Sequence, residues 1–174
     1  IKYTKRFDKI NLQNLGLFYD PIEIKESIDR CNLKDREAID LSISRVFEFH
    51  KKQMPANLSW KDELGIELGW VWKPVDRVGV YVPGGKASYP SSAIMNIVPA
   101  KVAGVHDIVL ASPSPNGDFN PLTLYVSSAM NITEILRVGG AQAIAALAFG
   151  TETVKKVNKI TGPGNEYVAE AKRQ

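Results

Sequence analysis

The sequence predicts an α/β protein in which a parallel sheet carries helices on both faces and follows a helical segment and a β-hairpin. The first observation is a change in composition. Residues 1–77 include 27 charged residues, whereas residues 78–174 include only 14 but hold ten of the thirteen glycines. The second is a rhythm of apolar, β-rich runs, each followed by a helix-like stretch: 78–82, 107–112, 133–138 and 157–161. Strands that alternate with helices at this spacing indicate βαβ units with parallel pairing.

Length and composition limit the classes that need considering. A chain of 174 residues is one domain of ordinary size or two small ones. We place the boundary after residue 77, with 1–77 as part of an incomplete first domain and 78–174 as a second domain. The net charge of +3 is too small, and too mixed with acidic residues, to favour a nucleic-acid partner. No apolar run approaches the roughly 20 residues that span a bilayer, so we expect no membrane partner.

The single cysteine, Cys31, excludes an internal disulfide and fits a cytoplasmic protein. The polar opening residues do not form a signal peptide. A chain that begins with Ile1 in mid-pattern and ends within a helix at Gln174 is expected to be a piece of a longer protein.

The helical segment has clear start and stop signals. Asp20 is a good N-cap and Pro21 suits the first helical position, so a helix begins there. A longer helix is expected over about 33–53, where apolar residues recur at helical spacing before Pro55. The stretch 66–72 alternates loosely, which predicts a strand that pairs with the next strand along the chain.

The second part reads as a Rossmann-like half with four parallel strands. Its helices are expected at about 90–104, 120–130, 140–149 and 164–174, in right-handed crossovers. Pro99 lies inside the first of these helices and is expected to kink or split it.

Three strand-to-helix turns of this half are rich in glycine. They are Tyr81 to Gly85, Val138 to Gln142 and Thr161 to Asn165. Ligands of such sheets bind beyond the carboxyl ends of the strands, where N–H groups at helix N-termini face anions. The turns therefore favour a phosphate-bearing ligand such as a nucleotide. The alternative is that they are tight βα turns and nothing more, since no complete G-x-G-x-x-G or P-loop motif is present.

Catalytic or metal-binding residues are not evident. His50 and His106 are the only histidines, and no Cys or carboxylate stands at ligand spacing from either. No nucleophile, base or acid–base carboxylate pair is suggested by spacing. From the residues alone, the sequence predicts a nucleotide-binding α/β module.

At these turns the chain resembles the histidinol dehydrogenase family. The matching strings are VGVYVPGG from Val78, YPSS from Tyr89, PAKVAGV from Pro99, VGGAQAIAALAFGTE from Val138 and ITGPGNEYVAEAK from Ile160. Fainter matches are YTKRFD from Tyr3 and FHKKQ from Phe49, so the resemblance runs along the whole chain.

The resemblance implies a function and its parts. Members of the family oxidise L-histidinol to L-histidine in two hydride transfers to NAD, with a zinc ion that positions the substrate and a Glu-His pair that supports the chemistry. They are homodimers with two Rossmann-like units. The family's cofactor contacts fall on Tyr81, Gln142 and Asn165. Its zinc ligands and catalytic residues have no counterparts here, so the chain alone is expected to be inactive and to hold no stoichiometric zinc.

Two other functions remain open at this point. One is a related dehydrogenase that acts on another amino or sulfonated alcohol, because the residues that choose the substrate are absent. The other is a non-catalytic nucleotide-binding or assembly module in which the glycine turns are purely structural. We also expect that the chain self-associates, because Trp60, Trp70 and Trp72 gather on a hairpin at an edge and would be exposed.

Overall fold

The computed structural model describes residues 2–84 and 89–174, and Gly85 of the first glycine turn lies outside them. Four parallel strands form its central sheet: β3 (Arg77–Tyr81), β4 (Asp107–Ala111), β5 (Glu134–Leu136) and β6 (Lys159–Thr161). Their order across the sheet is β5-β4-β3-β6. This confirms the predicted parallel sheet. The chain moves outward from β3 to β4 and β5 and then returns to place β6 on the other side of β3.

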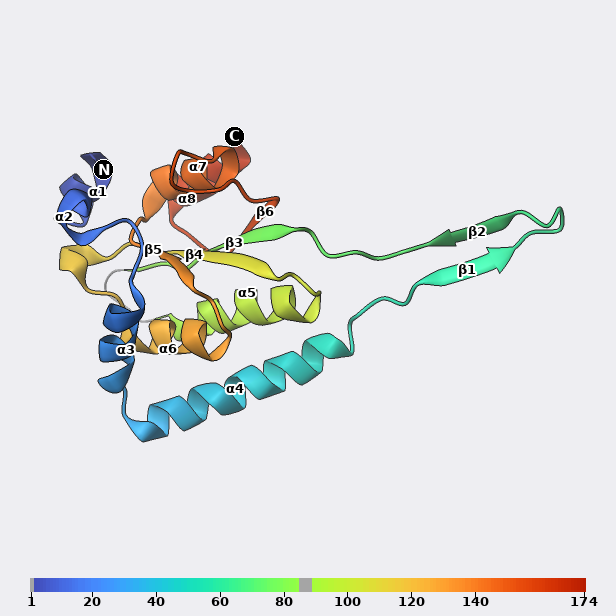
Figure 1. Cartoon of the computed structure of the whole chain (residues 1–174), viewed down its shortest axis with the longest axis horizontal. Coiled ribbons are helices and arrows are strands. Elements are labelled where there is room, and N and C mark those ends of the chain that lie inside the picture. The colour runs from blue at the N-terminus through green and yellow to red at the C-terminus, as the bar shows by residue number, and fades with distance from the viewer. Residues whose placement is uncertain (1, 85–88) are drawn as a thin grey trace.

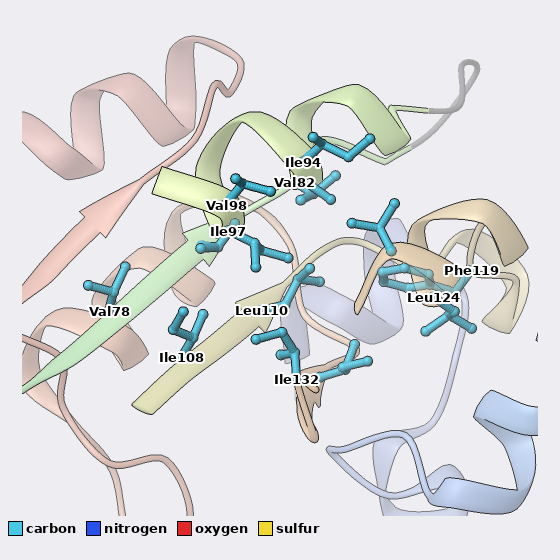
Figure 2. Close-up of a cluster of buried hydrophobic side chains, with 14 of the residues drawn as sticks. Val78, Val82, Ile94, Ile97, Val98, Ile108, Leu110, Phe119, Leu124 and Ile132 are labelled. Carbon is cyan, nitrogen blue, oxygen red and sulfur yellow. The ribbon is translucent and has the colours of Figure 1, made fainter. Parts of the chain in front are cut away.

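Helices cover both faces of the sheet, as predicted (Figure 1). On one face lie α5 (Pro90–Val102) and α6 (Pro121–Ala129), and on the other lie α7 (Gly140–Phe149) and α8 (Glu166–Arg173). Figure 2 shows the core on the first face, where Ile97 and Val98 of α5 approach Val78, Ile108 and Leu110 of the sheet. A second cluster joins the other face of β3 and β4 to α7 and α8. Burial on both faces explains why these strands are continuous apolar runs.

The residues before the sheet wrap around it. The chain begins with α1 (Lys2–Phe7) and α2 (Leu12–Leu15), and a short stretch then runs antiparallel to β5, with a bridge between Phe18 and Leu136. The helix α3 (Pro21–Asp29) starts at the expected place: Asp20 caps it and Glu23 completes a capping box. The long helix α4 (Leu33–Lys51) packs on α5.

Side chains from both sides of residue 77 share one core. Tyr19 and Ile39 belong to the same cluster as Val80 and Leu110. A domain boundary after residue 77, which stays a proposal, would therefore separate segments that pack on each other.

Arg77 ties together three strands at the amino edge of the sheet. Its buried guanidinium forms ion pairs with Asp107 of β4 and with Glu134 of β5, the latter at 2.6 Å. These two carboxylates raise the pKa of Arg77 further, so the group remains charged. Because the network lies at the edge opposite the glycine turns, its role is to hold the strands in place.

The hairpin differs from the prediction. The strand predicted at 66–72 is present as β2 (Glu67–Trp70), but it pairs antiparallel with the preceding β1 (Leu58–Lys61) and not with the next strand. Asp62 makes the tight turn between them by accepting hydrogen bonds from the N–H groups of Leu64 and Ile66. The hairpin is also not an edge of the main sheet, because it forms a two-stranded sheet of its own that extends away from the body (Figure 1).

Pro99 does not split its helix. The helix α5 runs without a break from Pro90 to Val102. Pro99 lies in the last turn, where its missing N–H costs a single helical hydrogen bond. No helix in the described residues is long and apolar enough to cross a membrane.

Candidate functional site

The candidate site is the carboxyl edge of the parallel sheet, where Tyr81 ends β3. The strands β4 and β6 lie on either side of β3 and run parallel to it, so the strand order changes side at β3: β4 and β5 extend the sheet one way and β6 the other. Open α/β sheets bind their ligands at such a switch point. Tyr81 therefore stands at the position where the fold favours a ligand.

Tyr81 contacts both of the other glycine turns. Its hydroxyl accepts a hydrogen bond from the N–H of Gly140, at 3.0 Å. Its carbonyl oxygen lies against Gly162, where a Cβ would overlap it, and Gly162 has a φ of 106° that a larger residue would resist. The ring itself is only 4% exposed. The three turns thus meet at one buried residue, through its hydroxyl and its backbone carbonyl.

Most of the glycines in these turns are explained by contacts within the protein. Gly84 and Gly139 both lie against Pro113, which follows β4, so that a Cβ at either position would overlap it. Gly164 is equally close to Val168 of α8. The glycines let the turns converge, and the chemistry for a ligand must come from polar groups nearby.

The N-terminus of α7 supplies part of that chemistry. No side chain caps this helix, and the Gly140 N–H is used by Tyr81. The N–H groups of Ala141 and Gln142 have no partner within the helix, because the first turn of any helix leaves its donors unpaired. The Gln142 side chain folds back toward Gly140, so its amide group lies next to the glycine turn.

Asn165 has a structural role that the sequence argument did not assign. It is the N-cap of α8, and its side-chain oxygen accepts a hydrogen bond from the N–H of Val168 at 3.1 Å. The cap uses only the oxygen, so the NH₂ group of the same amide can still donate to a ligand. Lys172 lies further along α8. Its ammonium donates a hydrogen bond to the carbonyl of Gly162 and so brings a positive charge to this turn.

Asp8 reaches this edge from the start of the chain and was missed by the sequence analysis. It is 6% exposed, and the backbone of Ser114, next to Pro113, partly offsets the effect of burial on the pKa of its carboxyl. Its backbone carbonyl accepts a hydrogen bond from the N–H of Asn116. Burial raises the pKa of Asp8. No spacing rule connects residue 8 with residue 114, so only the fold could reveal this contact.

A pocket of about 310 Å³ opens beside this edge, between α3 and α6, but its charges do not suit a phosphate. Three carboxylates, of Glu23, Glu26 and Asp118, line it together with Arg30 and Arg137. Arg137 is already paired with Glu23 and lies 3.7 Å from the centre of the Tyr19 ring. We therefore assign the pocket no role in nucleotide binding.

Metal ligands do not gather in the part of the chain that the structure describes. No three His, Cys, Asp or Glu side chains there lie close enough together to hold an ion. His50 lies in the last turn of α4, and its Nδ1 is 2.7 Å from Oε1 of Gln53, whereas His106 precedes β4 at the amino edge of the sheet. The described residues do not fit a zinc ion.

Comparison with known proteins decides the family. The model of the family described as histidinol dehydrogenase matches residues 1–174. The chain belongs to the histidinol dehydrogenase family. The resemblance seen in the glycine turns is thereby confirmed over the whole chain.

Relatives of the family share both sequence and fold with this chain. It is 49% identical over 174 residues to the histidinol dehydrogenase of Cereibacter sphaeroides and 50% identical to that of Mesorhizobium japonicum. The crystal structure of histidinol dehydrogenase from Elizabethkingia anophelis superposes on 99% of the chain with a TM-score of 0.94 at 36% identity. The chain spans 40% of the length of each of these relatives.

Proposed function

We propose that this chain is the NAD-binding portion of a histidinol dehydrogenase, with the cofactor at the carboxyl edge of the sheet near Tyr81, Gln142 and Asn165. The observation that carries the proposal is the contact of Tyr81 with both other glycine turns, at Gly140 and at Gly162. This arrangement gathers the polar groups of three separate turns at the switch point of the sheet.

Each group has a distinct task at this edge. The N–H groups at the start of α7 attract an anionic part of the cofactor, such as its pyrophosphate. The amides of Gln142 and Asn165 offer donors and acceptors without charge. Burial raises the pKa of Tyr81, so its hydroxyl keeps a proton to donate while it accepts from Gly140. When bound, NAD supplies the acceptor for a hydride.

The whole enzyme, as we propose it, oxidises L-histidinol to L-histidine in histidine biosynthesis. It is a zinc-dependent homodimer of the cytoplasm, in keeping with the single Cys31. The zinc ligands and the base that takes the alcohol proton are supplied by residues other than those described here. The chain alone therefore binds NAD without turning over histidinol and without retaining zinc.

The test separates the cap of Asn165 from its amide. Asn165→Ser keeps an oxygen that can cap α8 but removes the NH₂ donor, whereas Asn165→Ala removes both. We expect the serine variant to keep the stability of the parent and to weaken NAD binding about tenfold, measured by calorimetric titration. The alanine variant weakens binding to a similar degree and also loses about 1 kcal/mol of stability.

Other outcomes would favour the open alternatives. If NAD does not bind the parent chain, the glycine turns are structural and the chain is an assembly module. If Asn165→Ser binds NAD as the parent does, the cap is the whole role of Asn165. A dehydrogenase for another amino or sulfonated alcohol would bind NAD equally well, and oxidation assays of the complete enzyme with histidinol distinguish it.

A further inference from the structure

The three glycine turns of the candidate site contain no charged side chain. Their residues are all apolar or neutral, from Tyr81 to Gly85, from Val138 to Gln142 and from Thr161 to Asn165. The pyrophosphate of a dinucleotide is an anion with a negative charge on each phosphate, whereas the N–H groups at the start of α7 carry only partial positive charges. A full positive charge for this ligand therefore has to come from a residue outside the turns.

Lys172 of α8 brings an ammonium group to one of these turns. Its Nζ donates a hydrogen bond to the carbonyl of Gly162, the residue that lies against the carbonyl of Tyr81. Side chains of a helix lean toward its N-terminus, and residues four apart share a face. Lys172 follows Val168 by four residues, and the N–H of Val168 is the one that Asn165 caps. The ammonium of Lys172 and the amide of Asn165 therefore lie toward the same end of α8.

No carboxylate in the described part of the chain pairs with Lys172. The neighbouring ion pair of α8 joins Arg173 to Glu170, whose carboxylate also accepts a hydrogen bond from Gln174. Burial lowers the pKa of Lys172, and no nearby carboxylate offsets that effect. Lysine side chains usually place their ammonium in water, whereas that of Lys172 turns back to a carbonyl oxygen. Its positive charge is therefore held at the turn without a compensating negative charge.

Tyr81 connects this ammonium with the start of α7. Its backbone carbonyl lies against Gly162, which accepts the hydrogen bond from Lys172, and its hydroxyl accepts one from Gly140, the first residue of α7. The helices α7 and α8 pack side by side on one face of the sheet (Figure 1). An anion at this edge can therefore meet the unpaired N–H groups of α7 and the charge of Lys172 together.

We propose that the ammonium of Lys172 binds a phosphate of the dinucleotide. An ammonium has three N–H donors, so one can stay on the carbonyl of Gly162 while another donates to the ligand. Lys172 thereby adds to the proposed NAD site, on which this inference rests, a group that recognises the charge of the ligand. The alternative is a structural role, because a basic residue in the last turn of a helix favours the helix dipole.

The experiment compares Lys172→Met with Lys155→Met by calorimetric titration with NAD. Both variants remove one lysine charge, but Lys155 is exposed in the loop that follows the far end of α7. We expect Lys172→Met to raise the dissociation constant of NAD about tenfold or more at low salt, because a charge-assisted hydrogen bond is lost. Lys155→Met is expected to bind NAD as the parent does. Urea denaturation confirms that both variants remain folded.

Two further measurements separate a phosphate contact from a structural role. Added salt should weaken the binding of NAD to the parent more than to Lys172→Met, because salt screens a charge that only the parent carries at the site. Displacement of NAD by ADP and by adenosine compares a ligand that has paired phosphates with one that has none. We expect Lys172→Met to lose affinity for ADP and to keep the affinity of the parent for adenosine.

The contrary results fall on different claims. If Lys172→Met binds NAD as the parent does at low and at high salt, Lys172 contacts no phosphate and the proposed cofactor site stands. If Lys172→Met loses affinity for ADP and adenosine alike, Lys172 acts only by holding the turn through Gly162, and the phosphate contact is overturned. A parent chain that binds no NAD overturns the proposed site and the role of Lys172 together.

Discussion

The hydroxyl of Tyr81 accepts a hydrogen bond from the backbone N–H of Gly140, with 3.0 Å between the oxygen and the nitrogen. The bond connects the end of β3 with the first residue of α7, although β4 separates β3 from the strand that leads into α7. Gly140 has a φ of 71°, a backbone conformation that favours glycine at this position. One side chain thus fixes the start of the helix whose other donors face the candidate site.

We expect Tyr81→Phe to destabilise the chain by about 1–3 kcal/mol, because the N–H of Gly140 loses its acceptor in a buried place. NAD binding should weaken as well, since the start of α7 is no longer held. Urea denaturation measures the first effect and calorimetric titration the second. Tyr167→Phe is the control: its ring is exposed, so its stability should change by less than about 0.5 kcal/mol. Equal stability of both variants would contradict the role given to this hydrogen bond.

Gly162→Ala tests the contact between β3 and the turn after β6. A Cβ at this position would overlap the carbonyl oxygen of Tyr81, and the φ of 106° would strain the residue in addition. Gly65→Ala separates the two effects, because Gly65 has a φ of 80° with nothing within 4 Å of the added carbon. We expect about 1 kcal/mol of destabilisation at Gly65, from backbone strain alone.

At Gly162 the loss should be at least about twice as large, because the clash adds to the strain and the neighbouring atom is backbone that cannot rotate away. Urea denaturation midpoints compare the two variants. Similar losses at both positions would mean that the turn moves aside easily and that the close approach to Tyr81 is not needed.

The sequence was sufficient to place the parallel strands and the turns that follow them. Each strand is a short run followed by a helix, three of the four turns are rich in glycine, and burial makes β3 and β4 continuous apolar runs. Tyr81, Gln142 and Asn165 could therefore be placed at one edge of one sheet. Their roles as cofactor contacts came from the family resemblance and remain a proposal.

Most of the remainder depended on contacts that no local pattern encodes. The four-residue strand β1 (Leu58–Lys61) is too short to stand out, and its partner is chosen by the turn at Asp62 rather than by the distance to the next apolar run. The capping role of Asn165 had a local signal, an Asn directly before Glu166 at a helix start, which the sequence analysis did not use. Asp8 had none, because Asn116, whose N–H its backbone carbonyl accepts, is more than a hundred residues away.

The buried carboxyl of Asp8 predicts an unusual dependence of stability on pH. Burial raises its pKa in the folded chain above the ordinary value, so the folded state binds the proton more tightly than the unfolded state does. Stability contributed by this group is then greatest below the unfolded pKa, near pH 4, and is lost as the pH rises through the folded pKa. Asp8→Asn keeps the size of the side chain and removes the titration. We expect its free energy of unfolding, relative to the parent, to rise between pH 4 and pH 7, as measured by urea denaturation at a series of pH values.

Asp29→Asn should change with the opposite sign and only below about pH 4, because Lys25 lowers the pKa of the exposed Asp29 and the contribution of this carboxylate is lost as the pH falls through the lowered pKa. A difference between Asp8→Asn and the parent that stays constant across this range would show that Asp8 titrates alike in the folded and unfolded chain.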